Sequence, residues 1–349
     1  RSPHAHARIV AIRTEAALSV PGVEAVFTHA DAPGHLFSTA MHEHASEDPA
    51  DTRVLDDVVR FAGQRVAAVV ATSEAAAEAG CRALAVDYEL LPAVLDPRAA
   101  LAAGGDHVVA ELHASLGDVD AGFAEADEVY EATFDSPRMQ HASLETHGAV
   151  GWLDDNGRLV IRSSTQTPFL TRRAVARLFD LPDEQVRVVA GRVGGGFGGK
   201  QEMLVEDLVA LAVLRLRRPV RHEFTRAEQF TSATTRHPFT VTLRAGARAD
   251  GTLTAMQLRV LSDTGAYGNH GPAVMYHGCH ESLAVYRCPN KRTDAHAVHT
   301  NTVPAGAFRG YGLGQVTFAV ESVIDELARR LGIDQVTMRE RNVVRAGEP

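Results

Sequence analysis

A glycine-rich segment is the part of this sequence best suited to chemistry. It runs Gly194-Gly195-Gly196-Phe197-Gly198-Gly199-Lys200, between an expected strand over 187–190 and an expected helix over 201–217. Glycines let the backbone turn tightly and approach a ligand closely, and free amides at a helix start can hold an anion or an oxo group. The segment therefore predicts a binding loop.

Two nucleotide-binding patterns match this loop. It satisfies GxxxxGK, but Gln201 follows where a P-loop needs Ser or Thr for magnesium. It also satisfies GxGxxG, with Glu223 roughly where a ribose-binding acid would lie, which keeps an NAD-dependent dehydrogenase as an alternative. A run this rich in glycine fits many patterns, and a turn that merely packs a helix onto a sheet is the purely structural alternative.

A second candidate is the pair His141 and Glu145, because residues four apart on a helix share one face and could bind a metal. The segment 140–147 favours a turn into a strand. Buried hydrogen bonding is therefore the preferred interpretation.

Composition narrows the classes of function. The chain has 349 residues, 45% hydrophobic and 23% charged, which predicts two globular domains. The net charge of −9 argues against a nucleic-acid partner. No apolar run approaches the length of a membrane span. The widely spaced Cys81, Cys279 and Cys288 form no CxxC motif, so we do not expect an iron–sulfur or zinc site made of cysteines. We expect reduced thiols in a cytoplasmic protein.

Local patterns divide the chain into parts that must position these residues. Residues 1–97 alternate strand and helix, residues 98–127 are rich in Ala, Gly and Asp and predict a surface linker, and residues 128–349 form a larger domain. The expected strands are 66–70, 86–90, 129–134, 149–153, 159–163, 187–190, 240–244 and 253–261, and the expected helices are 72–84, 167–179, 201–217 and 316–331. Asn156-Gly157 and Asp250-Gly251 predict hairpin turns.

Three further segments accompany the loop: Ser163-Ser164-Thr165-Gln166-Thr167-Pro168, Gly265-Ala266-Tyr267 and Ala307-Phe308-Arg309-Gly310-Tyr311-Gly312. With 193–201 they resemble, in type and order, the molybdenum hydroxylases of the xanthine dehydrogenase and aldehyde oxidase family, and above all bacterial xanthine dehydrogenase molybdenum subunits. The resemblance covers nearly the whole chain. It implies an α+β fold: a small a/b hammerhead domain over 1–97, entered part-way, then the first molybdopterin-binding α+β domain over 128–349, without the second.

The resemblance also implies cofactor-binding residues. The family has a Gln that hydrogen-bonds an oxygen ligand of molybdenum, and it falls on Gln166. The family's Phe-Gly pair approaches the metal through its backbone, which points to Phe197 and Gly198, with Gly196 beside them. The family's arginine beside the cofactor is matched by Arg309. Gln166, Phe197 and Arg309 are thus expected near the metal without being its ligands.

The resemblance indicates the residues that contact the substrate less directly. Tyr311 falls where purine oxidisers place an aromatic that stacks on substrate, with core packing as the alternative. Gln201 replaces a Glu of many xanthine-oxidising members, and Gly268 replaces an Arg of some animal members. Similar bacterial members carry neighbours resembling Tyr267 and His270, so purine specificity stays open. Gly310 stands where carbon monoxide dehydrogenases carry a copper-binding Cys, which disfavours that activity.

As a whole, the resemblance implies a molybdenum-molybdopterin cofactor, in mono- or dinucleotide form. It implies an oxidoreductase that hydroxylates an N-heterocycle, such as a xanthine-like purine, or an aldehyde, with water as the oxygen source. The family's general-base Glu lies in the second molybdopterin domain, and no segment here matches it, so no catalytic residue is expected in this chain.

Arg1 in place of Met and the end at Pro349 suggest a piece of a longer polypeptide. The expected partners are a second molybdopterin domain or subunit, an Fe-S subunit and an FAD subunit. A degenerate or split assembly subunit without catalysis is a further alternative.

Overall fold

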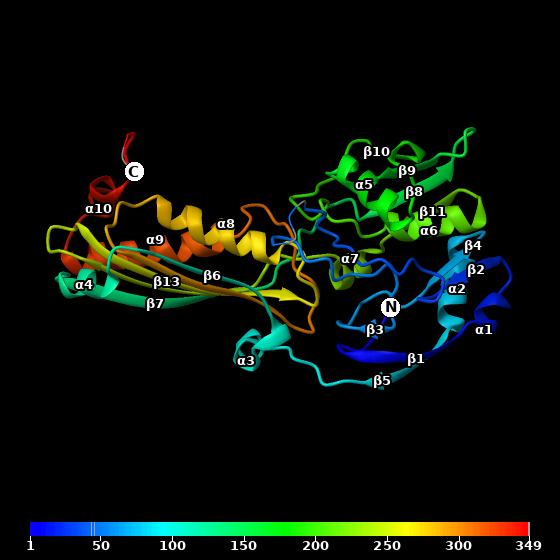
Figure 1. Cartoon of the computed structure of the whole chain (residues 1–349), viewed down its shortest axis with the longest axis horizontal. Coiled ribbons are helices and arrows are strands. Elements are labelled where there is room, and N and C mark those ends of the chain that lie inside the picture. Colours follow the sequence, from blue (N-terminus) through cyan, green and yellow to red (C-terminus); the bar gives the residue numbers. More distant parts are fainter. Residues whose placement is uncertain (43, 45, 348–349) are drawn as a thin grey trace.

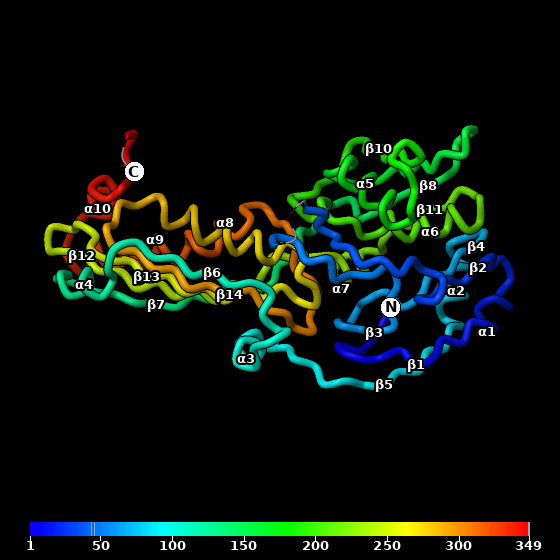
Figure 2. Tube along the Cα trace, in the orientation of Figure 1, coloured from blue at the N-terminus to red at the C-terminus, as the bar shows by residue number. Residues whose placement is uncertain are grey.

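A computed structural model describes residues 1–42, 44 and 46–347 (Figures 1 and 2). The molecule is elongated. One end holds the N-terminal elements and a four-stranded sheet, and the other holds a five-stranded sheet with long helices and the C-terminus (Figure 1). None of the described helices is long and apolar enough to cross a membrane.

The first part of the chain forms two small sheets, with strand order β3-β1-β5 and β2-β4, both antiparallel. Ser73 caps the helix that the sequence predicts over 72–84, because its side chain accepts a hydrogen bond from the backbone of Ala76. The elements are β1 (Ala7–Arg13), α1 (Glu15–Leu18), β2 (Val23–Phe27), β3 (Val58–Val59), β4 (Ala68–Ala71), α2 (Glu74–Ala83) and β5 (Ala85–Leu90).

The four-stranded sheet has the order β10-β9-β8-β11. Helices α5 and α6 pack on it, and their apolar side chains share a core with Phe37, Val54 and Leu55 of the first part. This shared core ties the two parts together. The elements are β8 (Gly148–Leu153), β9 (Leu159–Ser163), α5 (Pro168–Leu178), η2 (Asp183–Gln185), β10 (Val186–Ala190), α6 (Glu206–Leu216), β11 (Val220–Glu223) and α7 (Arg226–Ser232).

The five-stranded sheet has the order β6-β14-β13-β12-β7 and is antiparallel except between β13 and β14. Helices α8 and α9 cover one face and bury a large apolar core. The hairpins at Asn156-Gly157 and Asp250-Gly251 form as predicted. The elements are α3 (Pro97–Ala103), η1 (Gly105–His107), β6 (Val108–Leu116), α4 (Val119–Ala124), β7 (Glu128–Ser136), β12 (Phe239–Ala247), β13 (Leu253–Gly265), α8 (Gly271–Ala284), β14 (Lys291–His299), α9 (Leu313–Leu331) and α10 (Gln335–Asn342).

Two local expectations differ from the structure. Residues 98–127 are not a surface linker, because they contain β6, which pairs with β14 along the edge of the five-stranded sheet. An edge strand needs few large apolar residues, and the Ala- and Gly-rich segments on either side of β6 are typical of a linker. The helix expected over 201–217 begins only at Glu206. The amides of the glycine loop are therefore not those of a helix start.

Candidate functional site

Gln166 is hydrogen-bonded to the glycine loop. Its Oε1 accepts from the backbone N–H groups of Gly198 (3.1 Å) and Lys200 (3.3 Å), and its own backbone N–H donates to the carbonyl of Lys200 (2.7 Å). Because both side-chain partners are donors, the carbonyl oxygen must face them. The Gln166 side-chain NH₂ has no acceptor among the described residues and stays available to a ligand.

The segment 307–309 closes on the other side of the same loop. The backbone N–H of Arg309 donates to the carbonyl of Phe197 (2.8 Å). Gly198 has φ +102°, and a Cβ there would lie 2.7 Å from the carbonyl oxygen of Ala307. Only glycine allows so close an approach. Gln166, Phe197 and Arg309, predicted to share one site, are thus brought together.

The free donors at this junction come from three places. The backbone N–H groups of Gly196 and Phe197 have no acceptor within the described ranges, and neither does the exposed Arg309 guanidinium. The N–H of Gly198, expected to face the cofactor, is instead taken by Gln166. A Cβ on Gly196 would lie 2.3 Å from Gln166 Oε1. The surface is therefore lined by backbone and hydrogen-bond donors, which suits a ligand rich in oxygen acceptors.

Glu145 holds the two ends of the loop together. Its Oε2 accepts from the Lys200 ammonium (2.9 Å), the backbone N–H of Gly194 (2.6 Å) and the Ser164 hydroxyl (2.7 Å). Partial burial acts to raise the pKa of Glu145, but these hydrogen bonds outweigh it and lower the pKa to about 2. Lys200 is fully buried, so Glu145 also neutralises an interior charge.

Two buried histidines support the loop from the interior. His141 Nε2 donates to the carbonyl of Ala307 (2.7 Å), and its ring stacks on Phe308 at 4.3 Å. His147 Nε2 donates to the carbonyl of Gly199 (2.9 Å). Burial lowers the pKa of His141 to about 4 and keeps it neutral. Residues 140–147 are not helical, and the interpretation as buried hydrogen bonding is confirmed for His141. It is wrong for Glu145, whose side chain forms hydrogen bonds but is 42% exposed.

Tyr311 lies next to a pair of histidines. Its hydroxyl is 2.8 Å from His270 Nδ1 and 3.1 Å from His42 Nε2, and these two nitrogens lie 2.7 Å apart. Its backbone has φ +45°, in the left-handed region. Strain of this kind persists only where the surroundings fix the residue. Tyr311 is therefore held by its side chain, two residues beyond Arg309.

A buried acid continues this network. Glu202 Oε2 accepts from the Thr39 hydroxyl (2.7 Å) and the Asn269 side-chain amide (2.9 Å), while its Oε1 lies 3.3 Å from His270 Nε2. Burial raises the pKa of Glu202 to about 7 and lowers that of His270 well below its usual value. Sequence reasoning missed Glu202 and His42, which no motif singles out.

The four residues predicted to contact substrate separate into two groups. Gln201 and Tyr311 adjoin the loop, since Gln201 donates its backbone N–H to the carbonyl of Gly198 (2.9 Å). Tyr267 is instead buried, beside a small cavity that Phe61 and Asn269 also line. A Cβ on Gly268 would lie 2.1 Å from Pro49, so no side chain fits there without a shift.

Known proteins resemble this chain over nearly all of its length. Residues 1–92 match the model of the aldehyde oxidase and xanthine dehydrogenase a/b hammerhead domain, and residues 102–343 match that of the molybdopterin cofactor-binding domain. The xanthine dehydrogenase molybdenum-binding subunit of Escherichia coli O157:H7 is 39% identical over 100% of this chain and 48% of its own length. The nicotinate dehydrogenase large molybdopterin subunit of Eubacterium barkeri is 35% identical over 99% of this chain and 82% of its length.

Among solved structures, aldehyde oxidoreductase from Desulfovibrio gigas superposes with a TM-score of 0.94 at 34% identity, covering all of this chain and 40% of that one. The chain thus spans about half the length of the first of these relatives. These matches confirm the predicted resemblance and the mixed α and β fold. They give no support to an NAD-dependent dehydrogenase or to a non-catalytic assembly subunit.

Proposed function

Because this chain belongs to the aldehyde oxidase and xanthine dehydrogenase family of molybdenum hydroxylases, we propose that it binds the molybdenum cofactor in such an enzyme. The enzyme would hydroxylate an N-heterocycle, such as a xanthine-like purine, or an aldehyde, with water as the oxygen source. The observation that carries this proposal is the junction of Gln166, the glycine loop and Arg309, where hydrogen bonds join all three.

The residues at this junction fit a molybdopterin cofactor. Gly196 and Gly198 let Gln166 and Ala307 approach the loop more closely than any side chain would allow, and the free donors of Gln166, Phe197 and Arg309 suit a group rich in oxygen and sulfur acceptors. A neutral amide adds no charge that must be compensated, while a guanidinium offers several donors in a fixed plane. We propose that Gln166 and Phe197 face the metal end and that Arg309 stabilises negative charge beside it.

When bound, the cofactor supplies the two-electron oxidation and the activation of water. The chain's own residues would hold the cofactor and orient the substrate. Glu145 fixes the loop through Gly194 and Lys200, and Gln166 presents its side-chain NH₂. We propose that Tyr311, whose hydroxyl is held by His270, packs against a planar substrate beside the loop. Gln201 is the second proposed substrate contact, and the buried Tyr267 and Gly268 would shape the pocket wall indirectly.

Other parts of the enzyme are proposed to lie outside these residues. We expect the general-base Glu in a second molybdopterin domain or subunit, and electron transfer through Fe-S and FAD subunits. Several relatives are named as subunits, in line with this view. The free thiols of Cys81, Cys279 and Cys288 are compatible with a cytoplasmic location.

The test is the complete enzyme, purified with its partner subunits. We expect about one molybdenum and one pterin per chain, measured by mass spectrometry of the metal and fluorescence of the oxidised pterin. Turnover should be found with at least one of xanthine, nicotinate, an aromatic thioester or an aldehyde, with oxygen-18 from labelled water in the product. A complex that binds neither molybdenum nor pterin would refute the proposal, as would full activity of this chain alone.

A further inference from the structure

Four side chains of the types that bind metal ions share one face of the five-stranded sheet. Glu111 and His113 are two residues apart on β6, and Asp294 and His296 are two residues apart on β14. The antiparallel register sets His113 opposite Asp294 and Glu111 opposite His296. Side chains two apart on a strand point to the same face, and opposite residues are close neighbours. The fold therefore gathers two imidazoles and two carboxylates.

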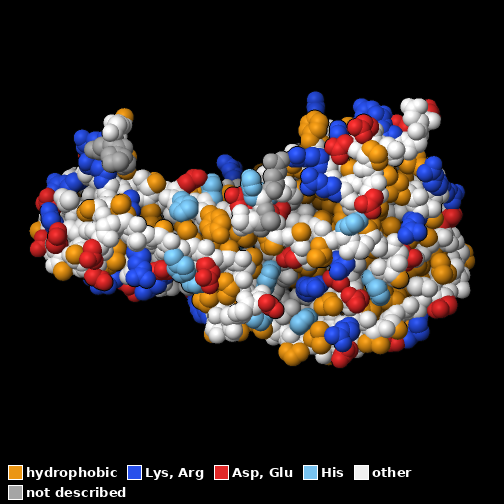
Figure 3. Space-filling model, viewed as in Figure 1, with side chains coloured by type: hydrophobic (Ala, Val, Ile, Leu, Met, Phe, Trp, Pro, Cys, Tyr) orange, Lys and Arg blue, Asp and Glu red, His pale blue; other side chains and the backbone are white. Residues whose placement is uncertain are grey.

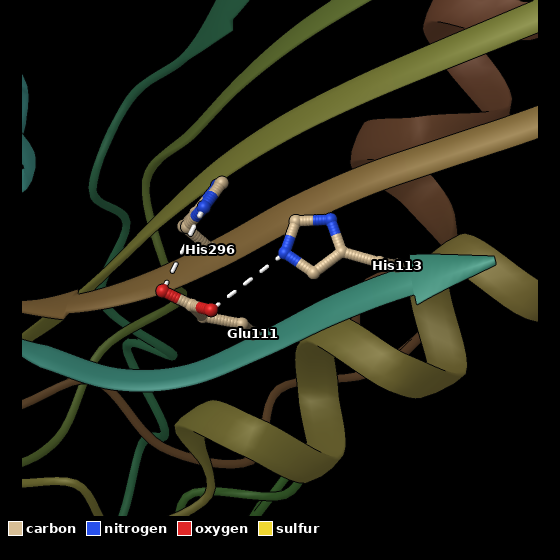
Figure 4. Close-up of side chains that lie close together, drawn as sticks. All are labelled: Glu111, His113 and His296. Carbon is tan, nitrogen blue, oxygen red and sulfur yellow. Dashed lines mark ion pairs between the residues drawn. The ribbon is translucent and has the colours of Figure 1, made fainter.

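Three of these side chains point toward one another (Figure 4). Ligand atoms of Glu111, His113 and His296 all lie within 4.8 Å of one another. His113 Nε2 is 3.6 Å from Glu111 Oε2, and His296 Nε2 is 4.0 Å from Glu111 Oε1. Ligands around one zinc ion lie about 3.3 Å apart, given metal–ligand distances near 2 Å. Small rotations of these partly exposed side chains would close the difference.

Asp294 provides an independent sign of a metal site. Its Oδ1 lies 2.8 Å from His113 Nδ1, and its Oδ2 accepts from the Arg292 guanidinium (2.8 Å). A carboxylate at Nδ1 favours a proton on that nitrogen, so Nε2, which faces Glu111, is the nitrogen that would bind a metal. Histidines that bind metals are typically oriented by a carboxylate in this way. Arg292 keeps Asp294 in this orienting position.

We propose that Glu111, His113 and His296 bind one divalent transition-metal ion, with zinc as the expected occupant. Two imidazoles and one carboxylate are a common zinc donor set, with water completing the coordination. Magnesium and calcium prefer oxygen ligands and would bind poorly. The site lies on β6 and β14, away from the glycine loop, and does not depend on the function proposed above. In Figure 3, histidine and acidic side chains lie side by side on the surface over β6.

A bound ion would stabilise the edge of the sheet. β6 is the outermost of the described strands in this sheet and pairs with β14, so ligands from both strands would cross-link the edge strand to its neighbour. A ligand that binds only the folded state raises the free energy of unfolding in proportion to the logarithm of its concentration. Zinc should therefore raise the melting temperature of the chain.

The test is titration of the untagged, chelator-treated full chain with zinc chloride by calorimetry. Cys81 is an exposed thiol that could bind zinc, so every variant carries Cys81→Ser. One equivalent should bind, and His113→Ala and His296→Ala should each weaken binding at least about 10-fold. Asp294→Asn keeps all three ligands and should weaken binding about 10-fold through loss of orientation.

His35→Ala is the matched control, because His35 is as exposed as His113 and also pairs with a carboxylate, at 3.1 Å from Asp180. Zinc binding by this variant should equal that of the parent chain. Glu111→Gln provides a second ligand variant should a histidine variant fail to fold. The absence of saturable binding, or binding that these ligand variants leave unchanged, would overturn the proposal.

Discussion

Glu202 Oε1 and His270 Nε2 lie 3.3 Å apart in the interior, and neither atom has another hydrogen-bond partner in the described part of the chain. Burial raises the pKa of Glu202 to about 7 and lowers that of His270, so below pH 7 the pair is neutral with its proton on the carboxyl group. Glu202 then donates to His270, whose Nδ1 faces the Tyr311 hydroxyl. The residue proposed to pack against substrate is thus positioned by a buried acid.

Replacing Glu202 with Gln should stabilise the chain at alkaline pH. The pKa of Glu202 rises from 4.5 in the unfolded chain to about 7 when folded, so the folded state binds the proton more tightly. Stability is therefore lost as the pH rises from 4.5 through 7, by up to about 3 kcal/mol. Glu202→Gln is neutral at every pH and keeps the same shape.

Urea unfolding at pH 5 and pH 8 measures this difference. The variant should exceed the wild type mainly at pH 8, and Glu74→Gln, on the exposed surface of α2, should follow the wild type at both values. Equal gains at both pH values would contradict a protonated Glu202.

The contribution of Glu145 to stability should depend on pH in the opposite direction. The pKa of Glu145 is lowered to about 2, so its contribution is present above pH 4.5 and disappears as the pH falls toward 2. Glu145→Ala leaves the buried Lys200 ammonium without its partner and should cost about 2 kcal/mol at neutral pH, reduced from a fully buried pair because Glu145 is partly exposed. Thermal melting from pH 7 to pH 3 should show the two proteins converging in acid. A constant difference would argue against the ion pair.

Gly198→Ala tests the contact between the loop and the segment 307–309. The new Cβ would lie 2.7 Å from the Ala307 carbonyl oxygen, at a φ of +102°. We expect a loss of at least about 2 kcal/mol and a severalfold lower molybdenum content. Gly157→Ala is the control, because Gly157 also has a positive φ but nothing within 4 Å of its added Cβ. It should cost about 1 kcal/mol and leave the metal content unchanged.

Sequence patterns predicted the elements with strong local signals. The hairpins at Asn156-Gly157 and Asp250-Gly251 and the helix predicted over 72–84 depend on nearby residues only, and they form as expected. β6 was missed because its partner β14 lies far away in the sequence, and pairing rather than local composition makes it a strand.

The residues of the candidate site also divide into those that a sequence pattern predicts and those that depend on distant contacts. Gln166, Phe197 and Arg309 were predicted from ordered motifs, and the structure brings them together. His42 and Glu202 lie in no recognisable pattern, because their positions depend on contacts between the first part of the chain and the segment 269–311. The Gly198 amide was assigned to the cofactor because a sequence cannot show that Gln166 already accepts from it.

The variant Gln166→Glu separates the two roles proposed for Gln166, which are anchoring the loop and donating a hydrogen bond to the cofactor. A carboxylate oxygen can still accept from the backbone N–H groups of Gly198 and Lys200, so the loop should keep its anchor. The outward NH₂ donor, however, becomes an acceptor with a negative charge, which would repel oxygen atoms of the cofactor. We expect a melting temperature near that of the wild type but at least about 10-fold lower turnover, with reduced molybdenum content in the purified complex. Gln166→Ala, which loses both the anchor and the donor, should lower stability as well. Wild-type metal content and turnover in Gln166→Glu would show that the donor has no role at this site.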